Sequence, residues 1–302
     1  MRYSKLRAVI YISIILLCGS CSSVLRETKP EPVTGILGAF HQEIAVLEDK
    51  LTERQEKRIE GMQFVSGRLN GRRVVVAWTG VYTVNAAMTT TLLIEHYRPS
   101  EVIFTGVAGA VNPELSPGDI VIANETAFHD MGILWPQGLT YKGAKNPLDG
   151  WENPVFFPAD ERLVKLAEEA AKQIKLGAIK TKEGERTPRV VKGRVVTGNI
   201  FVASPAKCAE LRERLKADAV EMEGAAVAQV CFQQGVGHVV IRCISDKADE
   251  SAVEDLATFY MIAARNSASL VGEMVGLLAW QGSQAGNTEV KNQSAAHLAN
   301  KK

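Results

Sequence analysis

The feature of this chain that most constrains its fold is an unbroken alternation of strand-like and helix-like segments from residue 33 to residue 280. The strand-like segments are short apolar runs that end in Gly or polar residues, whereas the helix-like segments have apolar residues three and four positions apart. This alternation is typical of an α/β fold, in which helices flank a central mixed, mostly parallel twisted sheet. Because no linker or internal repeat interrupts it, we expect a single domain.

The expected elements follow one another in a regular order. Strands are predicted at residues 33–39, 62–69, 73–78, 101–105, 118–127, 190–197, 219–220 and 238–244. Helices are predicted at residues 41–57, 84–96, 159–174, 205–216, 223–234 and 253–279. Asn70 and Gly71 between two of the strands are a strong hairpin signal. The segments 132–158 and 176–188 are irregular, and we predict surface loops there.

The first 21 residues differ from the rest of the chain. Arg2, Lys5 and Arg7 precede an apolar run that is too short to span a bilayer, a pattern typical of a secretory signal. The end of this segment, Gly19-Ser20-Cys21, resembles a bacterial lipobox and makes Cys21 the predicted lipidation site. Cys18 stands where Leu is usual, so ordinary signal cleavage is an alternative, as is a cytosolic protein with an apolar N-terminus.

The segments that flank the predicted domain are polar. Residues 22–32 contain two prolines and suit a flexible tether, and residues 281–302 have too few large apolar side chains to pack, which predicts a disordered tail. We therefore expect an exported domain that a lipid holds to a bacterial membrane, at the periplasmic face or the cell surface.

Composition excludes several classes of function. The formal net charge is only +1, and the signal segment carries three cations and no acid, so nothing indicates a nucleic-acid partner. Cys208, Cys231 and Cys243 are too few and too widely spaced for a disulfide framework or a metal site. We expect no metal and no other cofactor.

Polar residues gather where the predicted strands end. Ligands of open α/β sheets bind at the carboxyl ends of the strands, because loops and helix N-termini converge there. The candidates at five such ends are Glu43, the Gly106–Gly109 turn, Asn199, Phe201, Glu221, Glu223, Arg242, Ser245 and Asp246. Their number predicts one binding site at this edge of the sheet.

Taken singly, each of these residues has a simpler structural explanation. Glu223 suits a helix start, where the helix dipole favours a carboxylate, and Glu43 suits a solvated helix surface. Arg242 and Asp246 would make a structural ion pair, and Phe201 would fit a core. Glu221 is as consistent with structure as with binding. His129-Asp130 has no nucleophile beside it, so we expect it to anchor a loop.

Five ordered blocks carry a resemblance to a known family: Gly35–Glu43, Thr105–Ala110, Thr197–Val202, Ala219–Gly224 and Ile241–Asp246. Over nearly all of residues 33–280 the chain resembles the 5′-methylthioadenosine/S-adenosylhomocysteine nucleosidases of the purine nucleoside phosphorylase and uridine phosphorylase superfamily. The resemblance implies hydrolysis of the bond between adenine N9 and the ribose, through an oxocarbenium-like transition state. The products would be adenine and a thioribose, and 5′-deoxyadenosine is a further candidate substrate.

The resemblance also implies a role for each matching residue. Asp246 would be the acid that protonates adenine N7, oriented by Ser245, and burial would give it the raised pKa that such an acid needs. Glu43 and Arg242 would position the attacking water, and Glu223 would bind the ribose hydroxyls with Glu221 in support. The other implied substrate contacts are Met222 at the sugar, Phe201 and the Val202 backbone at adenine, Val107, Ala108 and Gly109 in the Gly-rich turn, and Phe40, Val81 and Leu256 around the sulfur substituent.

Two positions depart from the family pattern. Val107 replaces a common Ser, which removes a donor that a phosphate dianion would use and so favours hydrolysis over phosphorolysis. Asn199 replaces a common Asp, for which we expect a modest structural effect. The rival readings are a futalosine-type hydrolase, a purine nucleoside phosphorylase and, from another class, a surface lipoprotein that binds polysaccharide.

The family further implies a homodimer, in which a neighbouring subunit closes the pocket for the sulfur substituent. The segment 134–158, with Trp135, Trp151, Phe156 and Phe157, is the candidate for that closure or for a cap on the core.

Overall fold

The computed structural model describes residues 31–181 and 184–299, and residues 32–302 form one compact unit. The predicted signal segment, Cys21 and most of the predicted tether lie outside the described residues. Among the residues that are described, no helix is both long enough and apolar enough to cross a membrane.

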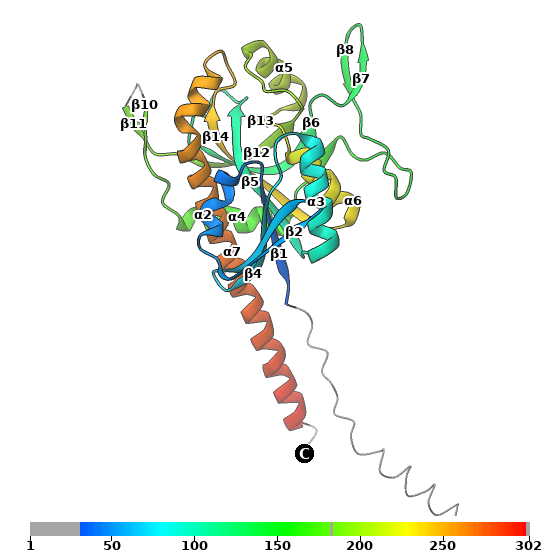
Figure 1. Ribbon diagram of the computed structural model, residues 1–302, viewed down its shortest axis with the longest axis vertical. Coiled ribbons are helices and arrows are strands. Elements are labelled where there is room, and N and C mark those ends of the chain that lie inside the picture. Colours follow the sequence, from blue (N-terminus) through cyan, green and yellow to red (C-terminus); the bar gives the residue numbers. More distant parts are fainter. Residues whose placement is uncertain (1–30, 182–183, 300–302) are drawn as a thin grey trace, which may run out of the picture. The chain divides into compact units, whose positions relative to one another are not determined.

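One ten-stranded sheet forms the centre of this unit (Figure 1). Its strand order is β13-β12-β6-β14-β5-β1-β4-β3-β2, with β9 paired to β6. The strands are β1 (Val33–Gly38), β2 (Thr52–Ile59), β3 (Met62–Leu69), β4 (Arg72–Trp78), β5 (Glu101–Ala110), β6 (Ile120–Phe128), β9 (Phe156–Pro158), β12 (Val190–Thr197), β13 (Ala219–Glu221) and β14 (Gly237–Asp246). The pairs β4-β1, β1-β5, β5-β14, β6-β12 and β12-β13 are parallel, and the others are antiparallel. The expected mixed sheet is confirmed, although parallel pairs do not outnumber antiparallel ones, because β13–β5 and β6–β9 are also antiparallel.

Helices cover both faces of the sheet, as predicted. They are α2 (His41–Glu48), α3 (Thr83–Tyr97), α4 (Glu161–Gln173), α5 (Pro205–Leu215), α6 (Gly224–Gln234) and α7 (Ala252–Ala299). Helices α3 and α6 pack together on one side, and α2 and α4 both pack on α7 on the other side. Strand β5 shows why two cores arise: Phe104 faces the α3/α6 core, whereas its neighbour Ile103 faces the core of α2, α4 and α7.

The predicted helix at residues 41–57 is too long. Helix α2 ends at Glu48, and Thr52–Ile59 forms β2, an edge strand that pairs antiparallel with β3. Glu60 and Gly61 connect the two strands with φ of 47° and 82°, the positive values that a tight hairpin turn requires. All β2 residues except Ile59 are exposed, so this charged segment forms a charged sheet edge.

The segments predicted as loops contain short hairpins. Strands β7 (Gly132–Trp135) and β8 (Gly138–Tyr141) pair with each other, as do β10 (Ile179–Thr181) and β11 (Gly184–Arg186). Helix α7 continues to Ala299, through residues 281–299 where the sequence predicts a disordered tail. The polar composition of that segment does not exclude a helix, because the segment has no Pro to stop it.

Candidate active site

A cavity lies at the carboxyl ends of β1, β5, β13 and β14, the edge of an open α/β sheet where ligands bind. The predicted site residues that line it are Phe40, Glu43, Val81, Val107, Ala108, Gly109, Phe201, Val202, Glu221, Met222, Glu223, Ser245, Asp246 and Leu256. The candidates Gly106, Asn199 and Arg242 do not line it. The structure adds Ala39, Ile200 and Val220, which the sequence offers only as apolar neighbours of those residues. Seven segments of the chain thus enclose one space.

Glu43 lies in the first turn of α2 and is buried. Its Oε2 accepts hydrogen bonds from the backbone N–H groups of Ala39 (2.6 Å) and Phe40 (3.0 Å), and its Oε1 accepts one from Val107 (3.2 Å). Burial raises the pKa of this carboxyl, while the charge of Arg242 and the three N–H donors oppose that rise. Glu43 is therefore not a solvated helix residue. Its Oε1 keeps acceptor capacity for a further donor.

Asp246 ends β14 and is also buried. The Ser245 hydroxyl donates to its Oδ2 (2.8 Å), and the Ala248 N–H donates to its Oδ1 (2.9 Å). Burial raises the pKa of Asp246, and these two donors act in the opposite direction. A buried carboxyl of this kind holds a proton more readily than a solvated one, as a general acid must.

Two glycines of β5 let these carboxyls approach the strand. A Cβ at Gly106 would lie 2.8 Å from Glu43 Oε1, and a Cβ at Gly109 would lie 2.8 Å from Asp246 Oδ1. Both distances are too short for a carbon next to an oxygen. The positions of Glu43 and Asp246 therefore depend on the bare backbone of β5.

Glu223 immediately precedes α6 and faces the same cavity. Its Oε1 accepts a hydrogen bond from the Tyr82 N–H (2.9 Å), and no other hydrogen bond to its side chain is found among the described residues. Burial, together with the charge of Glu221, raises the pKa of Glu223 to about 8. Glu223 thus enters the cavity with most of its hydrogen-bonding capacity free.

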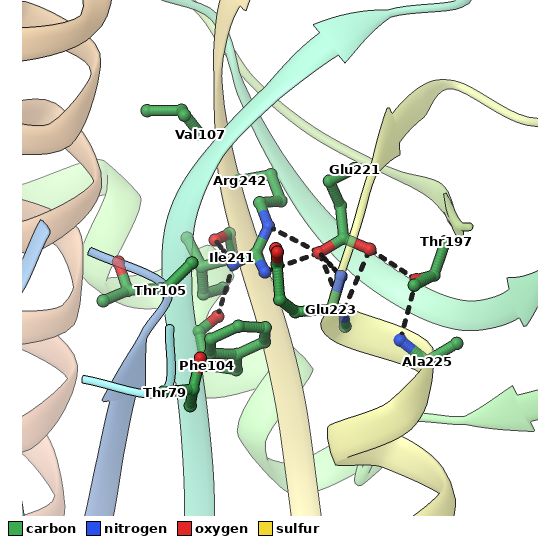
Figure 2. Close-up of polar contacts among 12 residues, drawn as sticks. Thr79, Phe104, Thr105, Val107, Thr197, Glu221, Glu223, Ala225, Ile241 and Arg242 are labelled. Atoms are coloured by element: carbon green, nitrogen blue, oxygen red, sulfur yellow. Dashed lines mark hydrogen bonds and ion pairs between the residues drawn. The ribbon is translucent and has the colours of Figure 1, made fainter. Parts of the chain in front are cut away.

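Glu221, in contrast, is bonded on all sides by the protein (Figure 2). Its Oε2 accepts from Arg242 Nη2 (2.7 Å) and Nε (3.2 Å), and Thr197 Oγ1 donates to its Oε1. The N–H of Gly224 lies 2.9 and 2.8 Å from its two oxygens, so Glu221 also caps the start of α6. The hydrogen bonds of Glu221 are therefore made within the protein, although its side chain also lines part of the cavity.

Arg242 does not line the cavity, and its ion pair is with Glu221 rather than with Asp246. Residues four apart on a strand are separated by about 13 Å, which is why Arg242 cannot reach Asp246. The Arg242 guanidinium lies 4.0 Å from the centre of the Phe104 ring. It acts on Glu43 through its charge, without an ion pair between the two.

Apolar side chains form the rest of the cavity wall. Phe201 is 44% exposed at the cavity, so it is not a core residue. Phe40 is similarly exposed and packs edge-to-face on Tyr260, with the ring centres 5.8 Å apart. Phe40, Val81 and Leu256 supply carbon surface for an apolar group. Within the described part of the chain, no group of His, Cys, Asp and Glu side chains is arranged to hold a metal ion.

Comparisons with known proteins agree with this architecture. The model of the phosphorylase superfamily matches residues 33–276. The 5′-methylthioadenosine/S-adenosylhomocysteine nucleosidase of Geobacillus sp. (strain WCH70) is 39% identical over 244 residues, which cover 80% of this chain and 97% of that protein.

Solved structures show the same similarity. The 5′-methylthioadenosine/S-adenosylhomocysteine nucleosidase from Neisseria meningitidis, in complex with methylthio-immucillin-A, aligns with a TM-score of 0.68 and 33% identity over 81% of this chain and 98% of that chain. Futalosine hydrolase of Helicobacter pylori strain 26695 aligns with a TM-score of 0.68 and 31% identity over 81% and 97% of the two chains.

Proposed function

Because the chain belongs to the phosphorylase superfamily and, within it, to the 5′-methylthioadenosine/S-adenosylhomocysteine nucleosidases, we propose that it hydrolyses the N-glycosidic bond of these two nucleosides. The products are adenine and the corresponding thioribose, and 5′-deoxyadenosine is a further candidate substrate. The observation that carries the proposal is one cavity with a buried Asp246 acid, a Glu223 acceptor and a buried Glu43.

Asp246 is the proposed general acid. Adenine is a poor leaving group as an anion, so a proton delivered to N7 as the bond breaks lowers the barrier. Burial favours the protonated form of Asp246, and the Ser245 hydroxyl, 2.8 Å away, orients the carboxyl and stabilises the carboxylate left after proton transfer.

Glu223 is the proposed ligand of the ribose 2′ and 3′ hydroxyls. Burial and the charge of Glu221 raise its pKa to about 8, and that pKa falls when two hydroxyl donors and a developing ribose cation favour the ionised form. The bonds of Glu223 therefore strengthen as the transition state forms, which is the condition for catalysis rather than mere binding. Met222 lies beside it against the sugar.

Glu43 is the proposed site of the attacking water. Its Oε1, already bonded to the Val107 N–H, has capacity to accept a hydrogen bond from water, and the charge of Arg242 favours ionised Glu43. Phe201 and the Val202 backbone are the proposed adenine contacts, and Phe40, Val81 and Leu256 are proposed to surround the sulfur substituent.

The test is an adenine-release assay of the purified domain, with and without phosphate. We expect adenine from 5′-methylthioadenosine and S-adenosylhomocysteine at rates that do not depend on phosphate. Release of adenine only when phosphate is present would contradict hydrolysis. A strong preference for futalosine in the same assay would contradict the proposed substrate class.

A homodimer is also proposed. Val84 and Met88 on α3 and Leu134 and Trp135 on β7 expose large apolar side chains, of which Leu134 is 78% exposed. Burial of these apolar side chains against a second copy of the chain would stabilise a dimer. The second copy would also cover the apolar end of the cavity. Light scattering after size exclusion is expected to give twice the mass of one chain, and the mass of a single chain would contradict the dimer.

Export with a lipid anchor at Cys21 is the remaining proposal, and the lipobox-like sequence supports it. Cells grown with a labelled fatty acid are expected to label the wild-type protein but not a Cys21→Ser variant. Unlabelled wild-type protein recovered outside the membrane fraction would contradict the anchor.

A further inference from the structure

The cavity has two walls that come from distant parts of the sequence. One wall is the segment 199–202, which carries Phe201 and Val202. The other is the segment 80–83 at the start of α3, where Val81 lines the cavity and the Tyr82 N–H donates a hydrogen bond to Glu223. The relative position of these walls decides whether the proposed base contact and ribose contact fit the same nucleoside.

The side chain of Asn199 joins the two walls. Its Oδ1 accepts hydrogen bonds from both the N–H (3.2 Å) and the hydroxyl (2.8 Å) of Thr83. Thr83 is the first residue of α3, and Tyr82 before it gives the helix no side-chain cap. The N-terminus of α3 is therefore capped by a residue 116 positions away, from the opposite wall.

Contacts with neighbouring residues also fix the position of each wall separately. The N–H of Asn199 donates to Asp130 Oδ2 (2.8 Å), and the buried His129 ring occupies the space where a Gly198 side chain would lie. Tyr82 has φ of 77° and ψ of 158°, a backbone conformation that only glycine adopts without strain. Such a conformation persists only where neighbouring contacts stabilise it. Here the hydrogen bonds of Tyr82 to Glu223 and of Thr83 to Asn199 stabilise it.

We propose that Asn199 is a positioning residue, which sets the separation of the two cavity walls through its bonds to Thr83. The proposal rests on the proposed nucleosidase function. Asn199 does not line the cavity, and Asp246 and Glu43 are held by other groups, namely Ser245, Ala248 and the backbone around α2. The backbone of Glu223 is held independently of Asn199, because Glu221 accepts hydrogen bonds from the N–H groups of Glu223 and Gly224. Loss of the Asn199 side chain therefore weakens substrate binding much more than the chemical step.

The decisive comparison is between Asn199→Ala and Asn199→Asp. We expect Asn199→Ala to raise KM for 5′-methylthioadenosine about tenfold and to change kcat less than about twofold, since two hydrogen bonds between the walls are lost. Asn199→Asp keeps an oxygen that accepts both Thr83 donors at a helix N-terminus, so its KM should stay within about twofold of wild type.

Two further variants complete the design. Thr83→Ala combined with Asn199→Ala should have the same KM as Asn199→Ala alone, because the hydroxyl bond is already absent. Thr91→Ala removes an exposed hydroxyl from the same helix, α3, eight residues after Thr83. Its KM should equal that of the wild type. Thermal unfolding of each variant shows whether a change in KM reflects loss of fold.

The proposal is overturned if Asn199→Ala leaves KM unchanged, if kcat falls as much as KM rises, or if Asn199→Asp is as impaired as Asn199→Ala. A wild-type protein that releases no adenine would instead contradict the proposed function. In that event calorimetric adenine binding gives the same comparison without turnover, with weaker binding expected only for Asn199→Ala. Equal adenine affinity in both variants would then overturn the role of Asn199.

Discussion

Glu221 and Glu223 are two residues apart and equally buried, with 6% and 5% exposure, yet their surroundings are opposite. Glu221 accepts hydrogen bonds from Arg242, Thr197 and the backbone that begins α6. Glu223 accepts one, from the Tyr82 N–H, and its pKa is raised to about 8. The comparison shows how to tell a structural carboxylate from a ligand-binding one: the first has its acceptors filled by protein, and the second keeps them free.

The same distinction separates two layers of the molecule. In the Arg242–Glu221–Thr197 layer the hydrogen-bonding groups are paired within the protein (Figure 2). Asp246, Glu43 and Glu223, in contrast, are buried at the cavity with acceptor capacity to spare. Substitutions in the first layer should therefore reduce stability, and substitutions in the second should reduce activity.

The largest expected effect is on catalysis, in the variant Asp246→Asn. An amide cannot deliver the proton to adenine N7, so kcat should fall by about 10³-fold. The melting temperature should change little, because the amide oxygen can still accept the Ala248 N–H. Steady-state adenine release and thermal unfolding measure the two quantities. A near-normal rate would remove Asp246 as the acid.

Glu221→Gln should affect mainly stability. It leaves the Arg242 guanidinium buried without a counter-charge, and breaking a buried pair in this way typically costs about 3 kcal/mol of unfolding free energy. Denaturant unfolding at pH 7 measures the loss. Glu161→Gln, which breaks an exposed pair with Lys165, is the matched control and should cost less than about 1 kcal/mol. Equal costs in the two variants would contradict the structural role of Glu221.

Glu223→Gln should raise the free energy of unfolding, whereas Glu221→Gln lowers it. Between the ordinary pKa of 4.5 and the folded value of about 8, the native state keeps a proton that the unfolded chain releases, so wild-type stability falls as pH rises. Gln does not titrate, and the variant should be more stable than wild type at pH 8 by on the order of 2 kcal/mol, although it binds ribose poorly.

Unfolding of both proteins at pH 4 and pH 8 checks this prediction. The difference in stability should be much smaller at pH 4, where Glu223 is protonated in both states. A difference that does not depend on pH would show that Glu223 has no raised pKa.

The smallest effect is expected for Val107→Ser. Residue 107 contributes its N–H to Glu43, and that donor survives any change of side chain. The rate of hydrolysis should therefore change less than about threefold, which corresponds to less than 1 kcal/mol. Adenine release with and without phosphate measures it. A large gain would mean that the missing hydroxyl limits the water site.

Much of the fold could be predicted from the sequence, because its strands and helices differ clearly in the spacing of apolar residues. Strand β2 could not, since an exposed edge strand has no buried face and so no alternation to detect. The Glu60-Gly61 turn was its one local signal. Helix α7 was placed correctly at its start but extends further than composition suggested.

The residues that line the cavity were also predicted, because strand ends and family motifs both point to them. The partner of Arg242 was not, since the ion pair with Glu221 joins β13 and β14, and sequence spacing does not show which strand ends meet. Strand geometry alone excludes the pair of Arg242 with Asp246. The bonds of Asn199 to Thr83 were equally out of reach, because they join loops 116 residues apart.

Gly106 and Gly109 give the site an unusual weakness. Neither has a reactive group, yet one added methyl at either position would collide with Glu43 or with Asp246. The proposed acid and the proposed water site thus each lie against a glycine of β5, and the two glycines are about 10 Å apart along the strand. The absence of a side chain is therefore part of the site at both positions, and a search for functional residues by chemistry alone would pass over both.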